Sequence, residues 1–295
     1  MYHIGIDVGG TNLQAGLVDR EGRILASVRE PLCFTDAEDF AAALARMAKA
    51  VMGDHPVSSV GIGIPGAVEG GNVLFTANIP MKDLPLEALF RRHLDLPVFL
   101  ANDADCAAAA EYLFGSGRGT RDFITVTLGT GIGGGLILGG KLHRGRCCAG
   151  EVGCMVVDGR AENGSWEYYA SATGLIRMAE AARTPESLLW DIPLNGRTIF
   201  DAADRGDRTA LAVVAEYDRW LGLGITNLVD ILQPERLAIG GGVSAAPERL
   251  LLEPVRQYVR DHCYGQYVGH FPEILRAELG NDAGVVGAAL IGGLL

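Results

Sequence analysis

Two glycine-rich turns in the sequence each follow an apolar run and stand beside a threonine. The first reads GGTN over residues 9–12 and follows Asp7 and Val8, and the second reads GTGIGGG over residues 129–135. Backbone N–H groups of consecutive glycines can point at an anion without a Cβ in the way. An acid at a strand end, here Asp7, suits a Mg²⁺ ion held mainly through water. The pattern favours a nucleotide phosphate site, with an ordinary glycine hairpin as the alternative.

A third glycine cluster, IGGGVS over residues 239–244, follows a predicted strand and precedes a predicted helix. Its bare backbone would let an adenine ring lie against it. None of the three is a Walker A loop, because no Gly-Lys-Ser/Thr follows, and the GxGxxG-like spacing of the second lies between two strands, which is not the Rossmann arrangement. Each cluster alone is a weak signal, and the three in this order are a strong one.

Asn102 and Asp103 lie at the junction of a predicted strand, 97–101, and an alanine-rich helix, 104–113. Phosphoryl transfer from ATP needs a hydroxyl aimed at the γ-phosphorus and a carboxylate that accepts its proton, and Asp103 is placed for that role. Aspartate at this position also commonly caps the following helix. Position alone does not separate the base from the cap, and one residue can do both.

The elements that must position these residues alternate between strands and helices. In the first half we expect strands at 2–8, 13–18, 24–28, 60–64 and 97–101 and helices at 37–52, 86–93 and 104–113. In the second half we expect strands at 123–128, 135–138, 236–239 and 273–277 and helices at 166–182, 208–232, 248–262 and 282–294. Each half opens with a strand hairpin whose turn carries a glycine cluster, which predicts two mixed α/β domains facing each other over a cleft. Residues 115–120, small and polar, are the best linker candidate.

Composition narrows the classes of protein. The chain has 295 residues, of which 41 are glycine, with 48% hydrophobic residues and a net charge of −11. The glycines fall in clusters between apolar runs, which excludes collagen and a disordered linker. An acidic chain repels phosphate backbones, so no nucleic-acid partner is expected. The basic residues at 118, 121, 141, 144 and 146 are interpreted as solvated loop residues.

The N-terminal sequence and the cysteines indicate a cytoplasmic protein. The first residues have no basic stretch ahead of an apolar one, so no signal peptide is predicted. The charge-free run 123–140 is rich in glycine and alternates like strands, which argues against a membrane span. Six scattered cysteines are too few for a secreted disulfide scaffold of this length.

In these motifs and their order, DVGGTN, LGTGIGGG, IGGGVS and the terminal GNDAG at 280–284, the chain resembles the ROK family of bacterial sugar kinases, in the actin/hexokinase-like ATPase superfamily. The resemblance covers essentially the whole chain. It implies a two-domain ribonuclease H-like/actin-like α/β fold, with residues 1–115 and the returning helix 282–295 in one domain and residues 116–281 in the other. It also implies a homodimer and ATP-dependent phosphorylation of a hexose.

The resemblance assigns roles to particular residues. Asp103 is the matching general base, with Mg²⁺ beside Asp7. The sugar would contact Asn102, Glu151 and Glu167, and less firmly Gly66 and Asn78. The nucleotide would lie against Gly9, Gly10, Thr11, Asn12, Thr130, Gly131, Gly241 and Gly242.

The chain departs from the family pattern at the residues that bind structural zinc and contact the sugar. The family usually carries a histidine where this chain has Cys154, followed by a cysteine knuckle that binds structural zinc, and the knuckle region 157–165 has no cysteine. Cys147, Cys148 and Cys154 lack the spacing of a zinc site, so no zinc is expected. A thiol at position 154 is a poor hydrogen-bond donor to the sugar, which leaves the sugar's identity open.

Two further functions compete with the kinase. ROK relatives include sugar-responsive repressors, but these carry a DNA-binding segment ahead of the kinase-like body, and this chain opens directly on the first phosphate strand. A catalytically inactive nucleotide or sugar sensor is argued against by the presence of Asp103 and both phosphate turns. Within the kinase class glucose is the default substrate, and N-acetylmannosamine, allose and fructose are the alternatives.

Overall fold

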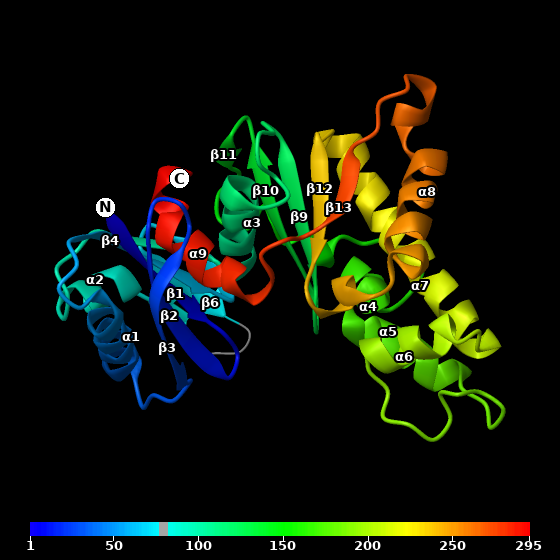
Figure 1. Ribbon diagram of the computed structural model, residues 1–295, viewed down its shortest axis with the longest axis horizontal. Helices are drawn as coiled ribbons and strands as arrows, with labels where there is room; N and C mark the ends of the chain where they lie inside the picture. Colours follow the sequence, from blue (N-terminus) through cyan, green and yellow to red (C-terminus); the bar gives the residue numbers. More distant parts are fainter. Residues whose placement is uncertain (77–81) are drawn as a thin grey trace. The chain divides into compact units, whose positions relative to one another are not determined.

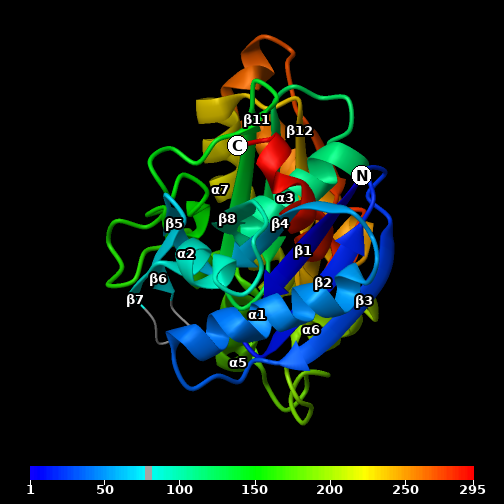
Figure 2. The same cartoon turned by 90° about the vertical axis from the view of Figure 1, so that its left-hand side faces the viewer.

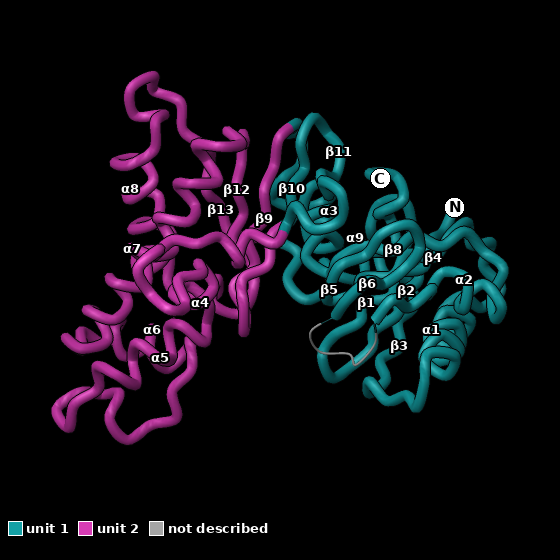
Figure 3. The backbone as a smooth tube through the Cα atoms, turned by 180° about the vertical axis from the view of Figure 1, so that it is seen from behind, with its two compact units in different colours: residues 1–121, 135–150, 278–295 teal, residues 122–134, 151–277 magenta. Residues whose placement is uncertain are grey.

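The structure, a computed structural model, describes residues 1–76 and 82–295. The chain forms two compact units, shown in Figure 3. Unit 1 contains residues 1–121, 135–150 and 278–295, and unit 2 contains residues 122–134 and 151–277. The domain boundary expected from the sequence lies at 115, and the structure additionally assigns residues 135–150 to the first unit.

Unit 1 is built on a five-stranded sheet in the order β3-β2-β1-β4-β8, of which Figure 1 labels the first four strands and Figure 2 also β8. Its strands are β1 (Tyr2–Val8), β2 (Asn12–Val18), β3 (Ile24–Pro31), β4 (Val57–Ile64) and β8 (Val98–Asn102). β1, β2 and β3 form an antiparallel meander, whereas β1, β4 and β8 run parallel. Carboxyl ends of parallel strands meet at one edge of a sheet, so the residues that follow β1 and β8 are brought to the same edge.

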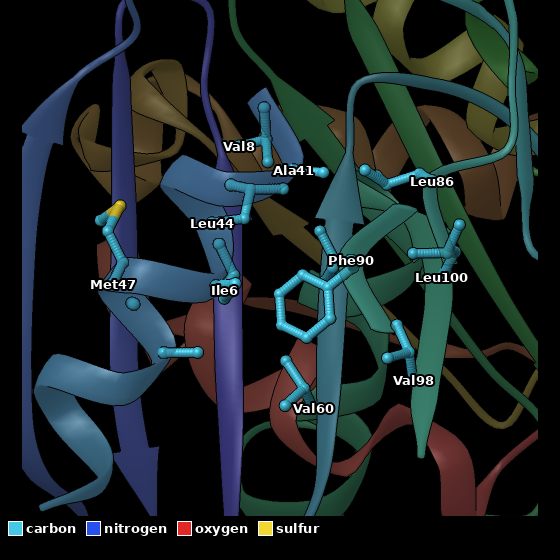
Figure 4. Packing of buried hydrophobic residues seen from close by; sticks show 14 of the residues in the cluster. Ile6, Val8, Ala41, Leu44, Met47, Val60, Leu86, Phe90, Val98 and Leu100 are labelled. Atoms are coloured by element: carbon cyan, nitrogen blue, oxygen red, sulfur yellow. The ribbon is translucent and has the colours of Figure 1, made fainter. Parts of the chain in front are cut away.

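The two faces of this sheet are covered by different helices. Successive side chains of β1 point to opposite faces, so each face has its own set of packing residues. Ile4, Ile6 and Val8 point into a core with α1 (Ala37–Met52) and α2 (Leu86–Arg91), and Figure 4 shows Ile6 and Val8 beside Leu44. The opposite face packs against α3 (Asp103–Phe114) and α9 (Ala283–Leu290). Figure 2 shows α1 lying along the sheet on its own side.

The α9 face depends on glycine at two strand positions. A Cβ on Gly5 would lie 1.9 Å from the Val285 carbonyl oxygen, and one on Gly61 would lie 1.7 Å from the Ala288 carbonyl oxygen. The backbone of α9 therefore rests directly on the backbones of β1 and β4. Much of the glycine excess in this unit serves helix–sheet packing as well as turns.

A small three-stranded sheet in unit 1 was not expected from the sequence. It consists of β5 (Gly66–Glu69), β6 (Asn72–Thr76) and β7 (Lys82–Leu84). Strands of three to five residues carry too little alternation to be recognised by pattern. Gly66 pairs with Thr76, and a Cβ on Gly66 would lie 2.1 Å from the Phe75 carbonyl oxygen, so this position requires glycine.

Unit 2 has a parallel arrangement in which β12 (Arg236–Gly240) lies between β9 (Phe123–Leu128) and β13 (Glu273–Arg276). The division between the units falls inside β10 (Ile132–Leu138), which continues to the short β11 (Lys141–Leu142). The helices of unit 2 are α4 (Trp166–Ala170), α5 (Ala172–Ala182), α6 (Gly196–Asp204), α7 (Arg208–Leu232) and α8 (Leu252–His262).

One expectation about a continuous segment is wrong in detail. The helix expected over 166–182 is broken at Ser171, whose backbone is extended and whose hydroxyl accepts a hydrogen bond from Gly174 N at 3.1 Å, capping α5. The linker candidate 115–120 is a hydrogen-bonded turn, because the buried Glu111 carboxylate accepts hydrogen bonds from the Ser116 N–H and hydroxyl. The other carboxylate oxygen of Glu111 accepts a hydrogen bond from Leu279 N at 2.7 Å.

Candidate active site

The carboxyl-terminal edge of the unit 1 sheet carries two aspartates. Asp7 is the penultimate residue of β1 and its side chain lies on the α9 face of the sheet, where a Cβ on Gly284 would come within 2.7 Å of its Oδ2. Asp103 follows β8 and begins α3. Gly284, within the terminal motif singled out in the sequence, thus leaves room for the Asp7 carboxylate, a role that only the packing reveals.

The cap of α3 is Asn102, one residue before the expected alternative. Asn102 Oδ1 accepts from Ala104 N at 2.7 Å and its Nδ2 donates to the Gly66 carbonyl oxygen at 3.1 Å. Asp103 is the first helical residue, and its Oδ1 also accepts from Ala104 N, at 2.9 Å. Since the Asn102 side chain already satisfies the helix end, the second carboxylate oxygen of Asp103 is not required for capping.

Burial perturbs both carboxyl groups, and the charge of Asp103 adds to the effect at Asp7. Burial raises the pKa of Asp103, against the opposing hydrogen bond from the Ala104 backbone. The pKa of Asp7 is raised to about 6, chiefly by burial and then by the negative charge of Asp103, with Arg29 acting in the opposite direction. Two nearby carboxylates with little positive charge beside them are typical of a site that binds a cation or transfers a proton.

The first glycine turn has the open backbone that a ligand would need. Gly9 N donates to the Asn12 carbonyl oxygen at 2.9 Å, which closes the turn, and a Cβ on Gly10 would meet nothing within 4 Å. Asn12 Nδ2 donates to Thr11 Oγ1 at 2.8 Å, so the Thr11 hydroxyl proton is left to point elsewhere. The turn offers donors on its exposed side.

The second glycine turn, in unit 2, is fastened to the start of α4 by Glu167. Its Oε2 accepts from Ile132 N at 3.0 Å, and a Cβ on Gly131 would lie 2.3 Å from that same oxygen. Within the turn Gly129 N donates to the Gly131 carbonyl oxygen at 3.0 Å, and the Thr130 carbonyl oxygen accepts from Thr173 Oγ1. One oxygen of Glu167 is therefore committed to holding this turn.

Glu151, Cys154 and Glu167 lie together in unit 2. The 3₁₀ turn Val152–Cys154 follows Glu151 directly, and its Gly153 is so close to β10 that a Cβ would lie 2.4 Å from the Ile132 carbonyl oxygen. The pKa of the Cys154 thiol is raised by burial and by the charges of Glu151 and Glu167. The thiol is therefore protonated and a weak nucleophile at neutral pH.

The third glycine cluster has one constrained and one open position. Gly241 has a positive φ of 80°, and a Cβ there would lie 2.4 Å from the Leu128 carbonyl oxygen, so two requirements select glycine. A Cβ on Gly242 would meet nothing within 4 Å. A 3₁₀ turn, Gly242–Ala245, follows the cluster directly, and in it Ser244 N and Oγ both donate to the Gly241 carbonyl oxygen. The helix expected over 248–262 begins after this turn, as a 3₁₀ turn at Glu248–Leu250 and then α8.

Of two further predicted residues, the structure describes only one. Asn78 lies outside the described residues. Arg144, interpreted from the sequence as solvated, is largely buried in unit 1, where it donates to the Val68 carbonyl oxygen at 2.8 Å and lies 3.9 Å from the Asp105 carboxylate. Its partners come from distant strands and helices, so the local sequence held no signal for this contact.

Comparison with known proteins agrees with this geometry. The model of a family described as the ROK family matches residues 3–292. The chain belongs to the ROK family. A glucokinase of Streptomyces coelicolor is 38% identical to this ROK protein, over 97% of this chain and 96% of its own length. A glucokinase of Thermotoga maritima is 35% identical, over 98% and 96% of the two chains.

A solved structure shows the same fold. The crystal structure of a ROK family glucokinase from Streptomyces griseus, in complex with glucose and AMPPNP, superposes with a TM-score of 0.80 at 38% identity and covers 98% of each chain. The sequence-based expectation of a ROK sugar kinase with the actin-like ATPase fold is thereby confirmed. The roles of individual residues in this ROK protein remain predictions.

Two kinds of feature are absent from residues 1–76 and 82–295, the part of the chain that the structure describes. These residues hold no group of three or more His, Cys, Asp or Glu side chains arranged to bind a metal ion. Among their helices, none combines the length and the apolar character that crossing a membrane demands.

Proposed function

We propose that this ROK protein is an ATP-dependent hexose kinase that transfers the γ-phosphoryl group of ATP to a sugar hydroxyl, with glucose as its substrate and the 6-OH as the acceptor. The observation that carries the proposal is Asp103, a half-buried carboxyl with a raised pKa directly after β8, of which only Oδ1 is used at the start of α3. Glucokinase relatives over nearly the whole chain support glucose.

Asp103 is assigned as the general base. Its Oδ1 is held by Ala104 N, so its Oδ2 is the oxygen that would take the hydroxyl proton as the hydroxyl oxygen bonds to the γ-phosphorus and ADP leaves. The pKa of Asp103 is raised by burial, which makes its carboxylate a stronger base than an exposed one. Catalysis otherwise consists of positioning and charge neutralisation.

Mg²⁺ fits the carboxylates of unit 1. Asp7 has its pKa raised to about 6 by burial and by Asp103, which shows a local excess of negative charge that a divalent cation would relieve. Asp7 would hold the ion through water, and the ion would supply neutralisation of the phosphate oxygens. Gly9, Gly10, Thr11 and Asn12 would bind phosphate through N–H and hydroxyl donors. Thr130, Gly131, Gly241 and Gly242 would bind the rest of the nucleotide.

The sugar is assigned to five described residues. Glu151 and the second oxygen of Glu167 would accept hydrogen bonds from vicinal hydroxyls, and Cys154 lies beside both. Gly66 and Asn102, joined by their own hydrogen bond, would complete the contacts in unit 1. The same proposal includes Asn78, a homodimer, a cytoplasmic location and no nucleic-acid or membrane partner, supported by the family and by the net charge of −11.

The deciding experiment measures ADP release with glucose, N-acetylmannosamine, allose and fructose. Glucose should give the highest kcat/KM, and 6-deoxyglucose should give no turnover. Asp103→Asn should lower kcat by roughly 10²- to 10⁴-fold, the range of general-base catalysis, with little change in thermal stability. Asp36→Asn is the matched control, since Asp36 caps α1 in the same unit and asparagine caps equally well. Near-normal turnover by Asp103→Asn would remove the base assignment, and no turnover on any sugar would favour a sensor.

A further inference from the structure

A cavity of about 290 Å³ lies in unit 2, apart from every residue assigned above. It opens between α7, the 3₁₀ turn Glu248–Leu250 and α8. Its walls are mainly apolar, formed by Leu211, Val214, Leu250, Pro254 and Tyr258. Apolar walls with a few convergent polar groups are characteristic of small-molecule sites, and this volume is close to the lower end of their range.

Asp218 is the buried acidic residue among those that line this cavity. The residue is 5% exposed, and its Oδ1 has no hydrogen-bond partner among the described residues. Buried carboxyl oxygens nearly always have a partner, because an unsatisfied one costs free energy. Burial alone raises the pKa of Asp218 to about 9. At neutral pH the group is therefore a neutral acid that both donates and accepts a hydrogen bond.

The two arginines of the cavity already have carboxylate partners. Arg219 bonds Glu216 through Nε and Nη2, at 3.0 and 2.8 Å, and Arg249 is paired with Asp204. An anionic ligand would have to compete with these carboxylates. A cationic ligand would have to approach two guanidinium groups. Electrostatics thus favours an uncharged ligand beside Asp218.

We propose that this cavity binds a small uncharged molecule with an apolar body and one polar group that both donates and accepts a hydrogen bond, a primary amide or a hydroxyl, which Asp218 holds. The apolar walls would bury the body of the ligand, and the acid would exchange a donor and an acceptor with its polar group. This binding is additional to the kinase activity and does not depend on it.

The test titrates four probes of one shape into the full chain and follows saturation-transfer NMR: benzamide, benzyl alcohol, benzoate and benzylamine. Benzamide and benzyl alcohol should bind with Kd on the order of 1 mM, as expected for ligands of eight or nine non-hydrogen atoms. Benzoate and benzylamine should bind at least tenfold more weakly. Absence of saturable binding of both neutral probes, or a preference for either charged probe, would overturn the proposal.

Paired variants locate the site. Ala215→Trp should abolish benzamide binding, since Ala215 lines the cavity, whereas Ala212→Trp on the same helix should not change it. Asp218→Asn keeps a donor and an acceptor and should bind within threefold of the unaltered chain, and Asp218→Leu should bind at least tenfold more weakly. Should Asp218→Leu not fold, the tryptophan pair still decides the matter. Benzamide binding that survives Ala215→Trp would place the ligand elsewhere and contradict the assignment.

Discussion

Replacing Asp218 by asparagine should stabilise unit 2, by an amount that grows as the pH rises. The Asp218 carboxyl has an ordinary pKa of 3.8 and a pKa of about 9 when buried in the folded chain. Below the lower value the folded and unfolded chains are both protonated there. Between the two values only the unfolded chain ionises, which favours unfolding by about 1.4 kcal/mol for each pH unit. From about pH 5 to about pH 8 the unaltered chain should therefore lose about 4 kcal/mol relative to Asp218→Asn.

Urea denaturation followed by tryptophan fluorescence measures this difference, because all three tryptophans, Trp166, Trp190 and Trp220, belong to unit 2. The same substitution at the exposed Asp201 of α6 is the control and should give a difference that does not vary with pH. A stability difference between Asp218→Asn and the unaltered chain that stays constant over this pH range would refute the reasoning, since it would mean that water reaches the carboxyl in the folded state.

Three further substitutions test other features of the structure. Glu111→Ala removes the acceptor of three hydrogen bonds and should lower the free energy of unfolding of unit 1 by about 3 kcal/mol. Urea denaturation measures this loss, and Glu180→Ala, at an exposed position, is the control that should leave the stability unchanged. Gly61→Ala should cost about 3 kcal/mol or prevent folding, because its Cβ meets the backbone of α9, whereas Gly293→Ala has open space and should melt normally. Glu167→Gln should lower kcat/KM for glucose by roughly 10- to 100-fold while the melting temperature changes little; a larger loss of stability than of activity would mark Glu167 as purely structural.

The elements with strong periodicity could be predicted from the sequence. The strand expected at 2–8 and the helices expected at 37–52 and 208–232 have the bounds of β1, α1 and α7. In each case an apolar pattern meets a clear boundary, such as Asp36, whose side chain caps α1. Local chemistry decides both the element and its ends there.

The elements that were missed or broken depend on partners distant in sequence. The small sheet at 66–84 exists through pairing of strands of three to five residues. The single serine at 171 divides a helix that periodicity alone would continue. Nor does any local pattern report that Arg144 is held by Val68, since the two are 76 positions apart.

The candidate site likewise has residues that the sequence predicts and contacts that it does not. Residue types and order singled out Asp7, Asp103 and the three glycine clusters, because each lies where a strand ends. The contacts that hold them were not predictable: Glu167 accepts a hydrogen bond from the second turn, and Asn102 shares the capping of α3 with Asp103. No regular repeat in the sequence relates the partners of these contacts, so no local pattern reports them.

The seating of α9 on β1 and β4 has a consequence for synthesis of the protein on the ribosome. β1 is made before the other strands of unit 1, yet its Gly5 face is covered by residues 283–290, which are made after the whole of unit 2. Unit 2 has all of its residues once position 277 has emerged, so it can fold while the rest is still being translated. Unit 1 must wait with an uncovered sheet face until residues 283–290 have been made. The nascent chain is therefore most exposed to aggregation in its oldest segment, and a chaperone that recognises this intermediate should contact the β1–β4 face.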